Sequence, residues 1–393
     1  MRLLGVIPHD VSGSSAAAKR WRLLFQALAD AGCETDLVSV APSDSGGVGN
    51  DGGLGFLDHY TRIAIPAGTS TVARYRLLRS TLYDACQERF AEGRPTAVLV
   101  YNQTAFAYGP LLSLARRHGI LRLAEFNEYH PPWVFRGGLA SPFYWDQSMF
   151  RLLVSRNLDG LVGISSFWAT WCPVRPPVLV MPPLVDPARA LSSVHDAGRN
   201  GFTIGYLGQC AARDLPGTMV DAVALARKRG FRARLLMYGR STTATRHLAA
   251  RHPEFVEDRG FIDEADLLAT LQRECDAFLL LRRGDRESLA CSPTRLGDYL
   301  NAGRPLIASD VGVIHDHFPH GTHCLRVPPD PPAALVADAI GTLCRDSSLA
   351  ALLATKARER AEGALSHHVH ARHLMDFVSR LKASARVPAG RAA

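Results

Sequence analysis

The sequence contains no apolar run as long as the roughly 18 to 20 residues that a membrane-spanning helix needs. The N-terminal stretch MRLLGVIP has too few apolar residues before Pro8 to be a signal peptide, and it is typical of a first β-strand. We therefore expect a cytoplasmic protein. Its 393 residues are enough for two domains, each with its own core.

Cysteine pairs and metal-binding patterns are also missing. The eight cysteines include no C-x-x-C pair, so neither disulfides nor structural zinc are expected. The histidines within 315–323 and 367–373 have no acidic or cysteine residues at ligand spacing, apart from the neighbouring Cys324, and predict no metal site. No Asp-x-Asp follows a predicted strand. A divalent metal is therefore not expected.

Lysine is scarce, because only four of the 45 basic residues are lysines, and arginine carries almost all of the +8 net charge. The basic segments KRWRLLFQAL and RYRLLRSTLYDACQERF are amphipathic and could give weak peripheral contact with the inner face of a membrane. We interpret them as solvated helix faces. No recognisable nucleic-acid-binding module accompanies them, so nucleic acid is not an expected partner.

Short apolar runs alternate with helical patterns along the whole chain, which is typical of parallel, doubly wound α/β sheets. The predicted strands are 3–7, 36–40, 97–100, 121–125 and 160–164 in the first half, and 203–207, 234–238, 277–281 and 306–309 in the second. Helices are predicted after Gly13, from Pro216 and over 264–274. The proline-rich segment 181–201 lacks periodicity and is interpreted as a linker. Two similar halves imply a cleft between them.

The segment ESLACSPTRLGDYLNAGRPLIASDVG, at 287–312, is the most informative part of the chain. Ser292 as N-cap, Pro293 in the first turn and Gly303 as a stop predict a short helix over 293–302. Its free backbone N–H groups and positive dipole end favour a phosphate, and Arg295 adds a full charge.

Asp298 lies one turn after Arg295 and could accept hydrogen bonds from the vicinal diol of a ribose. The alternative is that the two side chains form an ordinary surface ion pair at i, i+3. The residues around them favour the binding role.

This segment resembles the C-terminal signature of the retaining "group 1" GT-B glycosyltransferases, which runs approximately P-[ST]-K-L-x-E-Y-L-x-x-G-[RK]-P-[VL]-[VI]-A-[ST]-D. The corresponding residues are Pro293, Thr294, Arg295, Leu296, Gly297, Asp298, Tyr299, Leu300, Gly303, Arg304, Pro305 and Asp310, with Asp298 in place of the family glutamate. The resemblance implies two Rossmann-like domains facing a central cleft. It also implies a nucleotide-diphosphate sugar as donor, no cofactor, and retention of configuration. The acceptor would be a small molecule such as a sugar or natural product, a glycan, or a lipid-linked molecule.

By the same resemblance, Arg295 faces the donor diphosphate and Asp298 binds the ribose. The family glutamate expected eight positions before Asp298 is replaced by Ala290, and Glu287 is the nearest acid. This departure leaves open a GT-B-like protein with altered chemistry, such as a pseudo-glycosyltransferase, or an inactive partner.

The resemblance also implies the domain boundaries. We expect an acceptor-binding domain over 1–182 and a nucleotide-sugar-binding domain over 183–370. Within 371–393 we expect a helix that crosses back onto the first domain.

Loops that follow the strands of the second half contribute the other candidate donor residues. Gly208 permits close backbone approach, and Arg213 fits the family's basic residue at the donor phosphates, with pairing to Asp214 or solvent as the alternative. Arg240 ends the next strand. Glu287 and Thr294 complete the donor set, and the segment 260–267 is expected near the base.

The acceptor side is predicted from the aromatic-rich segment after the strand at 121–125. Glu125, Glu128, His130 and Trp133 fall there, and Glu128 or His130 could remove the proton of the acceptor hydroxyl. A structural role for His130 is the alternative. Arg213 and Arg295 are the other candidate catalytic residues, because they could stabilise the leaving diphosphate. The loop with Gly13 and Ser14 is a further acceptor candidate, by resemblance.

The sequence leaves two other classes of function open. Gly47, Gly49 and Gly52 satisfy G-x-G-x-x-G, but no helix follows them, so we interpret this segment as a loop and not as the fingerprint of an NAD(P)-dependent oxidoreductase. An arginine-rich protein that binds a membrane surface or RNA is the non-enzymatic alternative.

Overall fold

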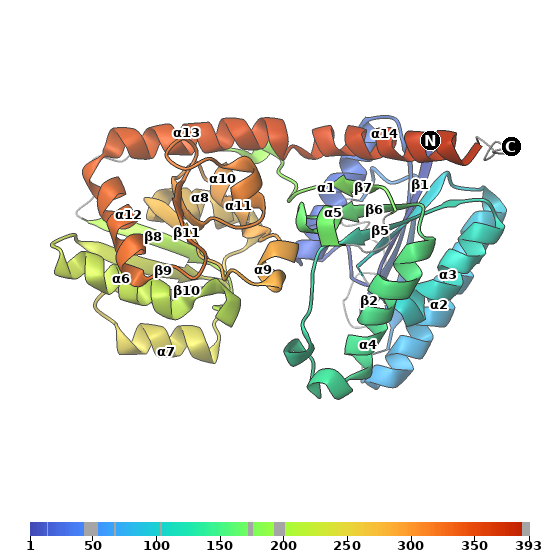
Figure 1. Cartoon of the computed structure of the whole chain (residues 1–393), viewed down its shortest axis with the longest axis horizontal. Coiled ribbons are helices and arrows are strands. Elements are labelled where there is room, and N and C mark those ends of the chain that lie inside the picture. The colour runs from blue at the N-terminus through green and yellow to red at the C-terminus, as the bar shows by residue number, and fades with distance from the viewer. Residues whose placement is uncertain are drawn as a thin grey trace, which may run out of the picture. The chain divides into compact units, whose positions relative to one another are not determined.

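The computed structural model describes residues 1–13, 15–42, 54–66, 68–102, 104–171, 176–191 and 201–386. They form two compact units (Figure 1). The first combines Met1–Leu184 with the C-terminal segment from His367, and the second is Val185–Ser366. The boundary lies two residues after the expected 182/183. The C-terminal segment joins the first unit from 367, four residues earlier than expected.

The first unit is built on a seven-stranded parallel sheet in the order β3-β2-β1-β4-β5-β6-β7. Its strands are β1 (Arg2–Ile7), β2 (Glu34–Pro42), β3 (His59–Ile65), β4 (Ala97–Tyr101), β5 (Leu121–Phe126), β6 (Gly160–Gly163) and β7 (Val178–Val180). The helices are α1 (Ala16–Asp30), α2 (Thr71–Glu92), α3 (Ala105–Arg117), α4 (Pro142–Met149), α5 (Phe167–Trp171) and α14 (His367–Arg386).

The second unit repeats this plan with a six-stranded parallel sheet in the order β10-β9-β8-β11-β12-β13. Its strands are β8 (Phe202–Leu207), β9 (Ala233–Tyr238), β10 (Val256–Gly260), β11 (Ala277–Leu280), β12 (Leu306–Ser309) and β13 (Leu325–Val327). Its helices are α6 (Pro216–Lys228), α7 (Thr243–Arg251), α8 (Glu264–Glu274), α9 (Arg286–Ala290), α10 (Arg295–Asn301), α11 (Val313–His317), α12 (Ala333–Arg345) and α13 (Ser347–Ala364). The expected α/β class with two doubly wound sheets is confirmed.

The core of the first unit explains the amphipathic segment KRWRLLFQAL. It forms α1, whose N-cap Ser15 accepts a hydrogen bond from Ala18 N at 3.1 Å. The apolar face of α1 is fully buried through Trp21 and Phe25. A side chain at Gly5 of β1 would collide with both rings, so the helix packs directly on the sheet. This face is therefore core and is not available to a membrane.

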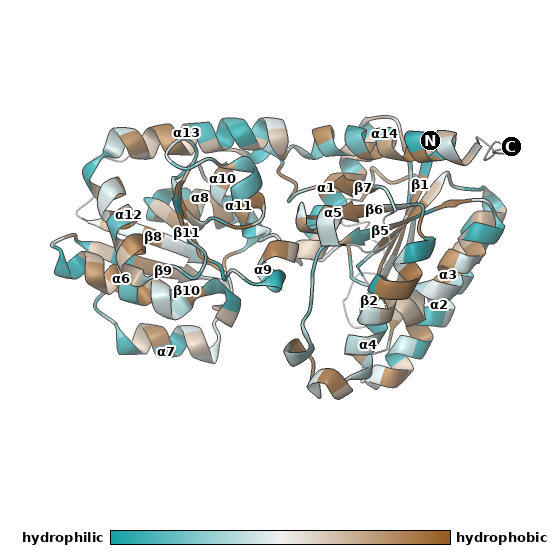
Figure 2. Ribbon diagram, in the orientation of Figure 1, coloured by the Kyte–Doolittle hydropathy of each residue, from teal (hydrophilic) through white to brown (hydrophobic). Residues whose placement is uncertain are grey.

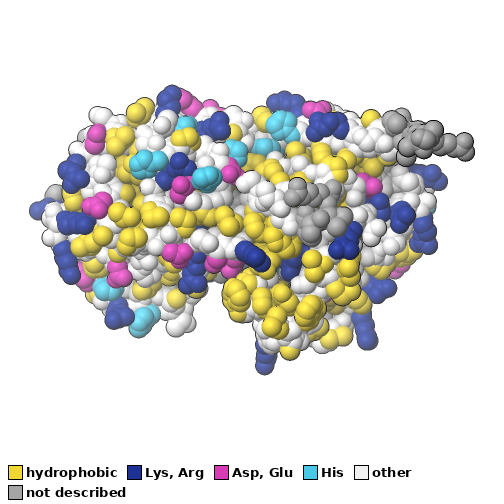
Figure 3. All heavy atoms as spheres, viewed as in Figure 1, with side chains coloured by type: hydrophobic (Ala, Val, Ile, Leu, Met, Phe, Trp, Pro, Cys, Tyr) yellow, Lys and Arg dark blue, Asp and Glu magenta, His cyan; other side chains and the backbone are white. Residues whose placement is uncertain are grey.

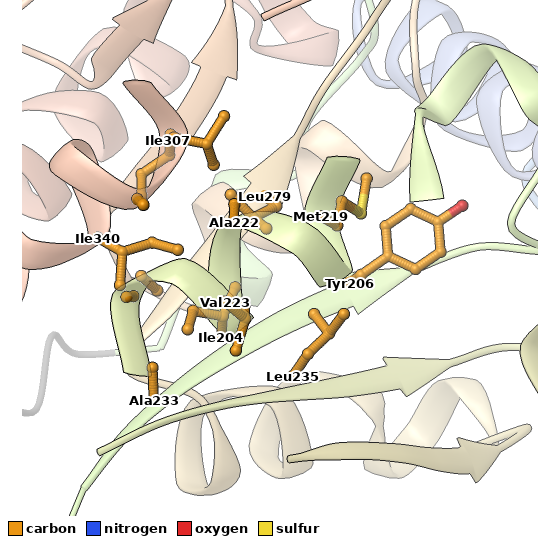
Figure 4. Close-up of a cluster of buried hydrophobic side chains, with 14 of the residues drawn as sticks. Ile204, Tyr206, Met219, Ala222, Val223, Ala233, Leu235, Leu279, Ile307 and Ile340 are labelled. Atoms are coloured by element: carbon orange, nitrogen blue, oxygen red, sulfur yellow. The ribbon is translucent and has the colours of Figure 1, made fainter. Parts of the chain in front are cut away.

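The C-terminal helix α14 completes that core. Leu374 and Val378 are fully buried in the same cluster as the apolar face of α1, and α14 lies against α1. The second unit has its own cores. Figure 4 shows part of one of them, where residues of β8, α6 and α12 such as Ile204, Val223 and Ile340 interdigitate. Among the described residues, no helix combines the length and the apolar character needed to cross a bilayer.

Candidate active site

The sheet of the second unit changes direction of winding between β8 and β11. These two strands are neighbours, whereas β9 and β10 continue on one side and β12 and β13 on the other. Ligands of open α/β sheets bind at such a point, beyond the carboxyl ends of the strands. Gly208 follows β8 there, and Arg282 follows β11.

A buried carboxylate, Asp214, organises this edge of the sheet. It lies in a single 3-10 turn (Ala212–Asp214) and is 3% exposed. One of its oxygens accepts a hydrogen bond from Arg295 Nη2, and the other accepts one from Tyr206 Oη at 2.7 Å. Arg282 Nη1 lies 3.4 Å from the oxygen that Arg295 binds. One carboxylate thus contacts two arginines and a tyrosine.

Arg295 is fixed by further contacts. Its Nη1 donates to Leu207 O at 2.6 Å, and its guanidinium lies 5.0 Å from the centre of the Tyr206 ring. The predicted helix start is wrong by two residues, because α10 begins at Arg295 and Thr294 takes the N-cap position without a side-chain bond. With only seven residues, α10 provides little dipole for a phosphate. The charge at this edge therefore comes from the arginines.

The electrostatics follow from burial and close pairing. Burial would raise the pKa of Asp214, but attraction to Arg295 and Arg282 outweighs it and holds that pKa below its ordinary value. Burial and, next, the charge of Arg295 together lower the pKa of Arg282 to about 10, against the opposing attraction of Asp214. For Arg295 burial also favours the neutral form, but Asp214 raises its pKa above the ordinary value. All three side chains are charged at neutral pH.

Gly208 allows this packing. Its φ of +153° is in a region that favours glycine, and a side chain there would collide with Arg295 Nη1 and lie 2.5 Å from Tyr206 Oη. The predicted close approach at Gly208 is thus an approach of the protein's own side chains.

Arg213 pairs with Glu287, not with Asp214 or solvent. The Arg213 Nη1 to Glu287 Oε1 distance is 2.9 Å, and the arginine side chain is one-third exposed. Glu287 lies in the first turn of α9, where Asp285 accepts from Ser288 N. Ala290, which replaces the family glutamate, is fully buried. The nearest acid is therefore held by an arginine of the neighbouring loop.

Several buried donors at this edge have no hydrogen-bond partner within the described ranges. They are Nε of Arg213, Nε and Nη1 of Arg282, Nε of Arg295, and the hydroxyls of Ser288 and Ser292. Three arginines face two carboxylates, Asp214 and Glu287, so the group carries a net charge of +1. Buried donors with excess positive charge are suited to an anionic ligand.

Three donor candidates remain. Arg240 and Thr294 are exposed, and Asp298 is half-buried one turn after Arg295. Arg240 follows Gly239, where an added Cβ would lie 2.6 Å from Gly208 O. The structure thus places Gly208 against Arg295 and pairs Arg213 with Glu287.

In the first unit the sheet changes direction between β1 and β4. His9 follows β1 there, and its ring lies edge-on to that of Tyr101, the last residue of β4, at 5.4 Å. Glu128 and His130 are brought together, with 2.9 Å between Oε2 and Nε2. Burial lowers the pKa of His9, opposed by the charge of Glu128. A half-exposed carboxylate–imidazole pair is able to accept a proton.

The structure corrects one acceptor candidate. Glu125 is fully buried, and both of its oxygens are used, by Arg20 Nε at 2.7 Å and Trp21 Nε1 at 2.6 Å. Arg20 continues to the carbonyls of Met181 and Pro182. Glu125 therefore ties β5 to α1 and to the end of the first unit, and it has no atom free for a ligand.

The other acceptor candidates are Trp133, Gly13 and Ser14. Trp133 is 77% exposed in a 3-10 turn. Gly13 O accepts from Arg22 Nη1 at 2.5 Å. Ser14 lies outside the described residues, as do Gly47, Gly49 and Gly52. Within the described ranges, no three His, Cys, Asp or Glu side chains gather as metal ligands would.

Three residues of these sites were not predicted from the sequence: Asp214, Arg282 and His9. Arg282 and His9 each follow a predicted strand, and a charged or titratable residue at that position is the signal that could have identified them. Asp214 carries no comparable signal in the sequence, because its arginine partners, Arg282 and Arg295, lie 68 and 81 residues away.

Residues 201–346 match the family model described as "Glycosyl transferases group 1". The matched residues all lie within the second unit. The resemblance of segment 287–312 to that family is thereby confirmed. No curated protein matches the chain.

Solved glycosyltransferase structures resemble the whole chain. Sucrose-phosphate synthase from Thermosynechococcus elongatus has a TM-score of 0.71 at 17% identity, covering 98% of this chain and 100% of the synthase. Anabaena HepE in complex with UDP and glucose has a TM-score of 0.68 at 14% identity, with 97% and 100% covered. WaaG, a glycosyltransferase involved in lipopolysaccharide biosynthesis, has a TM-score of 0.65 at 11% identity, with 96% and 99% covered. The chain has the GT-B fold.

Proposed function

We propose that this protein is a retaining glycosyltransferase that moves a sugar from a nucleotide-diphosphate donor to a hydroxyl acceptor. The observation that carries the proposal is the group of three arginines at the carboxyl ends of β8 and β11, with buried N–H donors still unpaired. A diphosphate supplies the anionic oxygens that such donors require.

The arginines would act on the leaving group. Negative charge grows on the diphosphate as the bond to the sugar breaks, and fixed cationic donors stabilise it without reorganising. Arg282 is best placed for this, because its Nε and Nη1 have no hydrogen-bond partner among the described residues, whereas both Nη atoms of Arg295 are bonded. We propose that these side chains do so without a metal ion. Retention of configuration is supported by the family resemblance.

UDP is the first nucleotide to test, because HepE, which shares the fold, has been solved with UDP and with UDP-glucose. Asp298 is proposed to bind the ribose, one turn of α10 from Arg295. On the first unit, the Glu128–His130 pair is proposed to take the proton of the acceptor hydroxyl. A sugar, a natural product or a lipid-linked molecule would fit that role. The described cysteines are all free thiols, which supports a cytoplasmic location.

One observation favours a second function, a nucleotide-binding protein without transfer activity. Ala290 replaces the family glutamate and is fully buried, while Glu287 is occupied by Arg213. Such a protein would bind the nucleotide sugar but release no nucleotide when an acceptor is added.

The test is a thermal-shift panel of UDP, GDP, dTDP, their sugars, NAD and NADP on the wild type, Arg282→Ala and Arg282→Lys. We expect one nucleoside diphosphate to stabilise the wild type, Arg282→Ala to lose most of the shift, and Arg282→Lys to keep part of it. The control is Arg251→Ala, an exposed arginine at the end of α7.

Three results decide among the alternatives. Nucleotide release with product formation on adding an acceptor supports transfer, and binding without release supports the second function. Stabilisation by NAD or NADP alone would contradict both.

A further inference from the structure

Exposed apolar side chains gather on one surface of the first unit. This apolar surface consists of Trp133, Val134, Leu139, Trp145, Met149, Leu152 and Leu153, which are 44% to 77% exposed. Val72 and Phe106 are exposed at the starts of α2 and α3. Figure 3 shows hydrophobic side chains collected over α4 and its neighbours, and Figure 2 shows brown segments among paler ones in the same ribbons. A large apolar patch on a soluble protein marks a site of interaction.

Contacts make this surface continuous. Trp145 Nε1 donates to Leu139 O at 2.7 Å, which joins α4 to the 3-10 turn Gly138–Ala140. The Tyr75 ring of α2 contacts Phe143 of α4 at 4.9 Å and Phe106 of α3 at 6.4 Å. The starts of α2 and α3 therefore border α4. Because the indole N–H of Trp145 is already bonded, that side chain can enter an apolar phase without losing a partner.

The helical segment from α4 through the π-helical turn Phe150–Val154 has apolar residues on both faces. Trp145, Met149 and Leu152 recur at helical spacing and are exposed, whereas Phe150 is fully buried on the opposite side. A helix on the surface of a soluble unit usually presents polar residues outward. The outward apolar row is thus unexplained by packing within the unit.

The exposed charged residues within 71–83 and 129–157 have one sign. Arg74, Arg76 and Arg79 of α2 are exposed, as are Arg136 and Arg156. No acidic residue occurs within 71–83, and the only one within 129–157 is Asp146. That carboxylate accepts from Thr104 Oγ1 and Phe106 N, both at 2.7 Å, so it caps α3.

We propose that the apolar surface docks on an anionic lipid membrane. Aromatic and aliphatic side chains would enter the interface between headgroups and acyl chains, and the five arginines would bind phosphate groups of the headgroups. This charge pattern favours lipid over a protein partner, because the one acidic residue within 71–83 and 129–157, Asp146, is already bonded at the start of α3. The surface is separate from the arginine group of the second unit, so the inference does not rest on the proposed function.

Vesicle flotation of the full-length protein tests this inference. Vesicles of equal parts phosphatidylglycerol and phosphatidylcholine are expected to carry the wild type, and phosphatidylcholine alone is not. The variant Leu139→Glu/Leu153→Glu places two charges in the apolar surface and is expected to lose at least about tenfold in affinity. Its matched control, Leu335→Glu/Leu352→Glu, changes two exposed leucines of the second unit and should bind like the wild type.

The arginines are tested in the same way. Each arginine near an anionic surface contributes roughly fivefold to affinity, so Arg76→Glu/Arg136→Glu should lose at least roughly 25-fold. The control Arg246→Glu/Arg251→Glu makes the same charge change on α7, where both arginines are exposed. High salt should weaken binding of the wild type.

The inference is overturned by any of three results. One is no flotation of the wild type with anionic vesicles. Another is an equal loss in a patch variant and its control, with circular dichroism showing both folded. The third is a dimer that Leu139→Glu/Leu153→Glu dissociates while lipid binding is unchanged, which would assign the surface to a second copy of the chain.

Discussion

Asp214 is the residue on which the arrangement of the donor-side arginines depends. Its carboxylate neutralises part of the positive charge of Arg295 and Arg282, which are shielded from water. Its second oxygen accepts a hydrogen bond from Tyr206. Removing one partner of a buried ionic group leaves the other charges unpaired, and this costs far more than losing a surface pair.

We therefore expect Asp214→Asn to lower the free energy of unfolding of the second unit by about 3 to 5 kcal/mol. Denaturant titration followed by far-UV circular dichroism measures it. The control is Asp338→Asn, which breaks the exposed pair with Arg229 and should lose less than about 1 kcal/mol. Equal losses in the two variants would contradict a buried, charged Asp214.

The same residue gives a pH dependence. The pKa of Asp214 in the folded protein lies below its ordinary value of 3.8. Its contribution is therefore fully present above pH 3.8 and is lost as the pH falls through the folded value. The difference in unfolding free energy between the wild type and Asp214→Asn should be constant from neutral pH to about 5 and should narrow below about 4. A difference that widens on acidification would reverse the assigned direction.

A comparison of Gly208→Ala with Gly230→Ala separates the cost of backbone strain from the cost of a steric collision. At Gly208 a methyl group meets Arg295 and Tyr206, whereas at Gly230, with a φ of +91°, nothing lies within 4 Å. Gly230→Ala should cost about 1 to 2 kcal/mol through the backbone alone. Gly208→Ala should cost more and should also remove the thermal shift by nucleoside diphosphates, because Arg295 must move. A Gly208→Ala protein with a normal shift would show that Arg295 is not needed at its present position.

The sequence identified those residues of the site that a local motif fixes. Arg295 and Gly208 were predicted from a helix start and from a glycine after a strand, and both lie in the arginine group. Glu125 was misjudged because its position at the end of a strand does not reveal that Arg20 and Trp21 take both of its oxygens. Contacts between residues a hundred positions apart leave no local pattern.

Among the elements, periodicity decided what could be predicted. The helix over 264–274 and the strand over 306–309 were predicted with the bounds that α8 and β12 have, because each has a regular apolar pattern. The edge strands β3, β7, β10 and β13 were missed. β3 and β10 are mostly half-exposed or exposed, and β7 and β13 have three residues each, so none has the longer buried apolar run that marked the others.

The C-terminal helix gives a prediction at this scale. Leu374 of α14 is fully buried in the core of the first unit, so Leu374→Ala should lower its free energy of unfolding by about 2 to 5 kcal/mol. All five tryptophans lie within residues 21–171, so tryptophan fluorescence reports the first unit alone. Leu352→Ala, at a half-exposed leucine of α13, is the control and should leave the fluorescence transition unchanged. A loss seen only by circular dichroism would place α14 with the second unit.

At the scale of the whole molecule, the chain builds two units whose hydrophobic clusters share no residue. The cluster of the first unit draws on both ends of the chain, and those of the second lie within 185–365. The similar halves of the sequence predicted this division. The return of the chain to the first unit was expected from the family resemblance alone.

Separate cores predict separate responses to ligand. A nucleoside diphosphate that binds at the β8–β11 edge stabilises the second unit by RT ln(1 + [L]/Kd), which is about 2.7 kcal/mol at a hundredfold excess over Kd. In denaturant titration, the transition followed by circular dichroism should therefore gain a component at higher denaturant when the nucleotide is added. The tryptophan transition should stay where it was. With Arg282→Ala, neither should move. A tryptophan transition that shifts with the nucleotide as far as the circular-dichroism component would mean that the ligand also binds the first unit or that the two units unfold together.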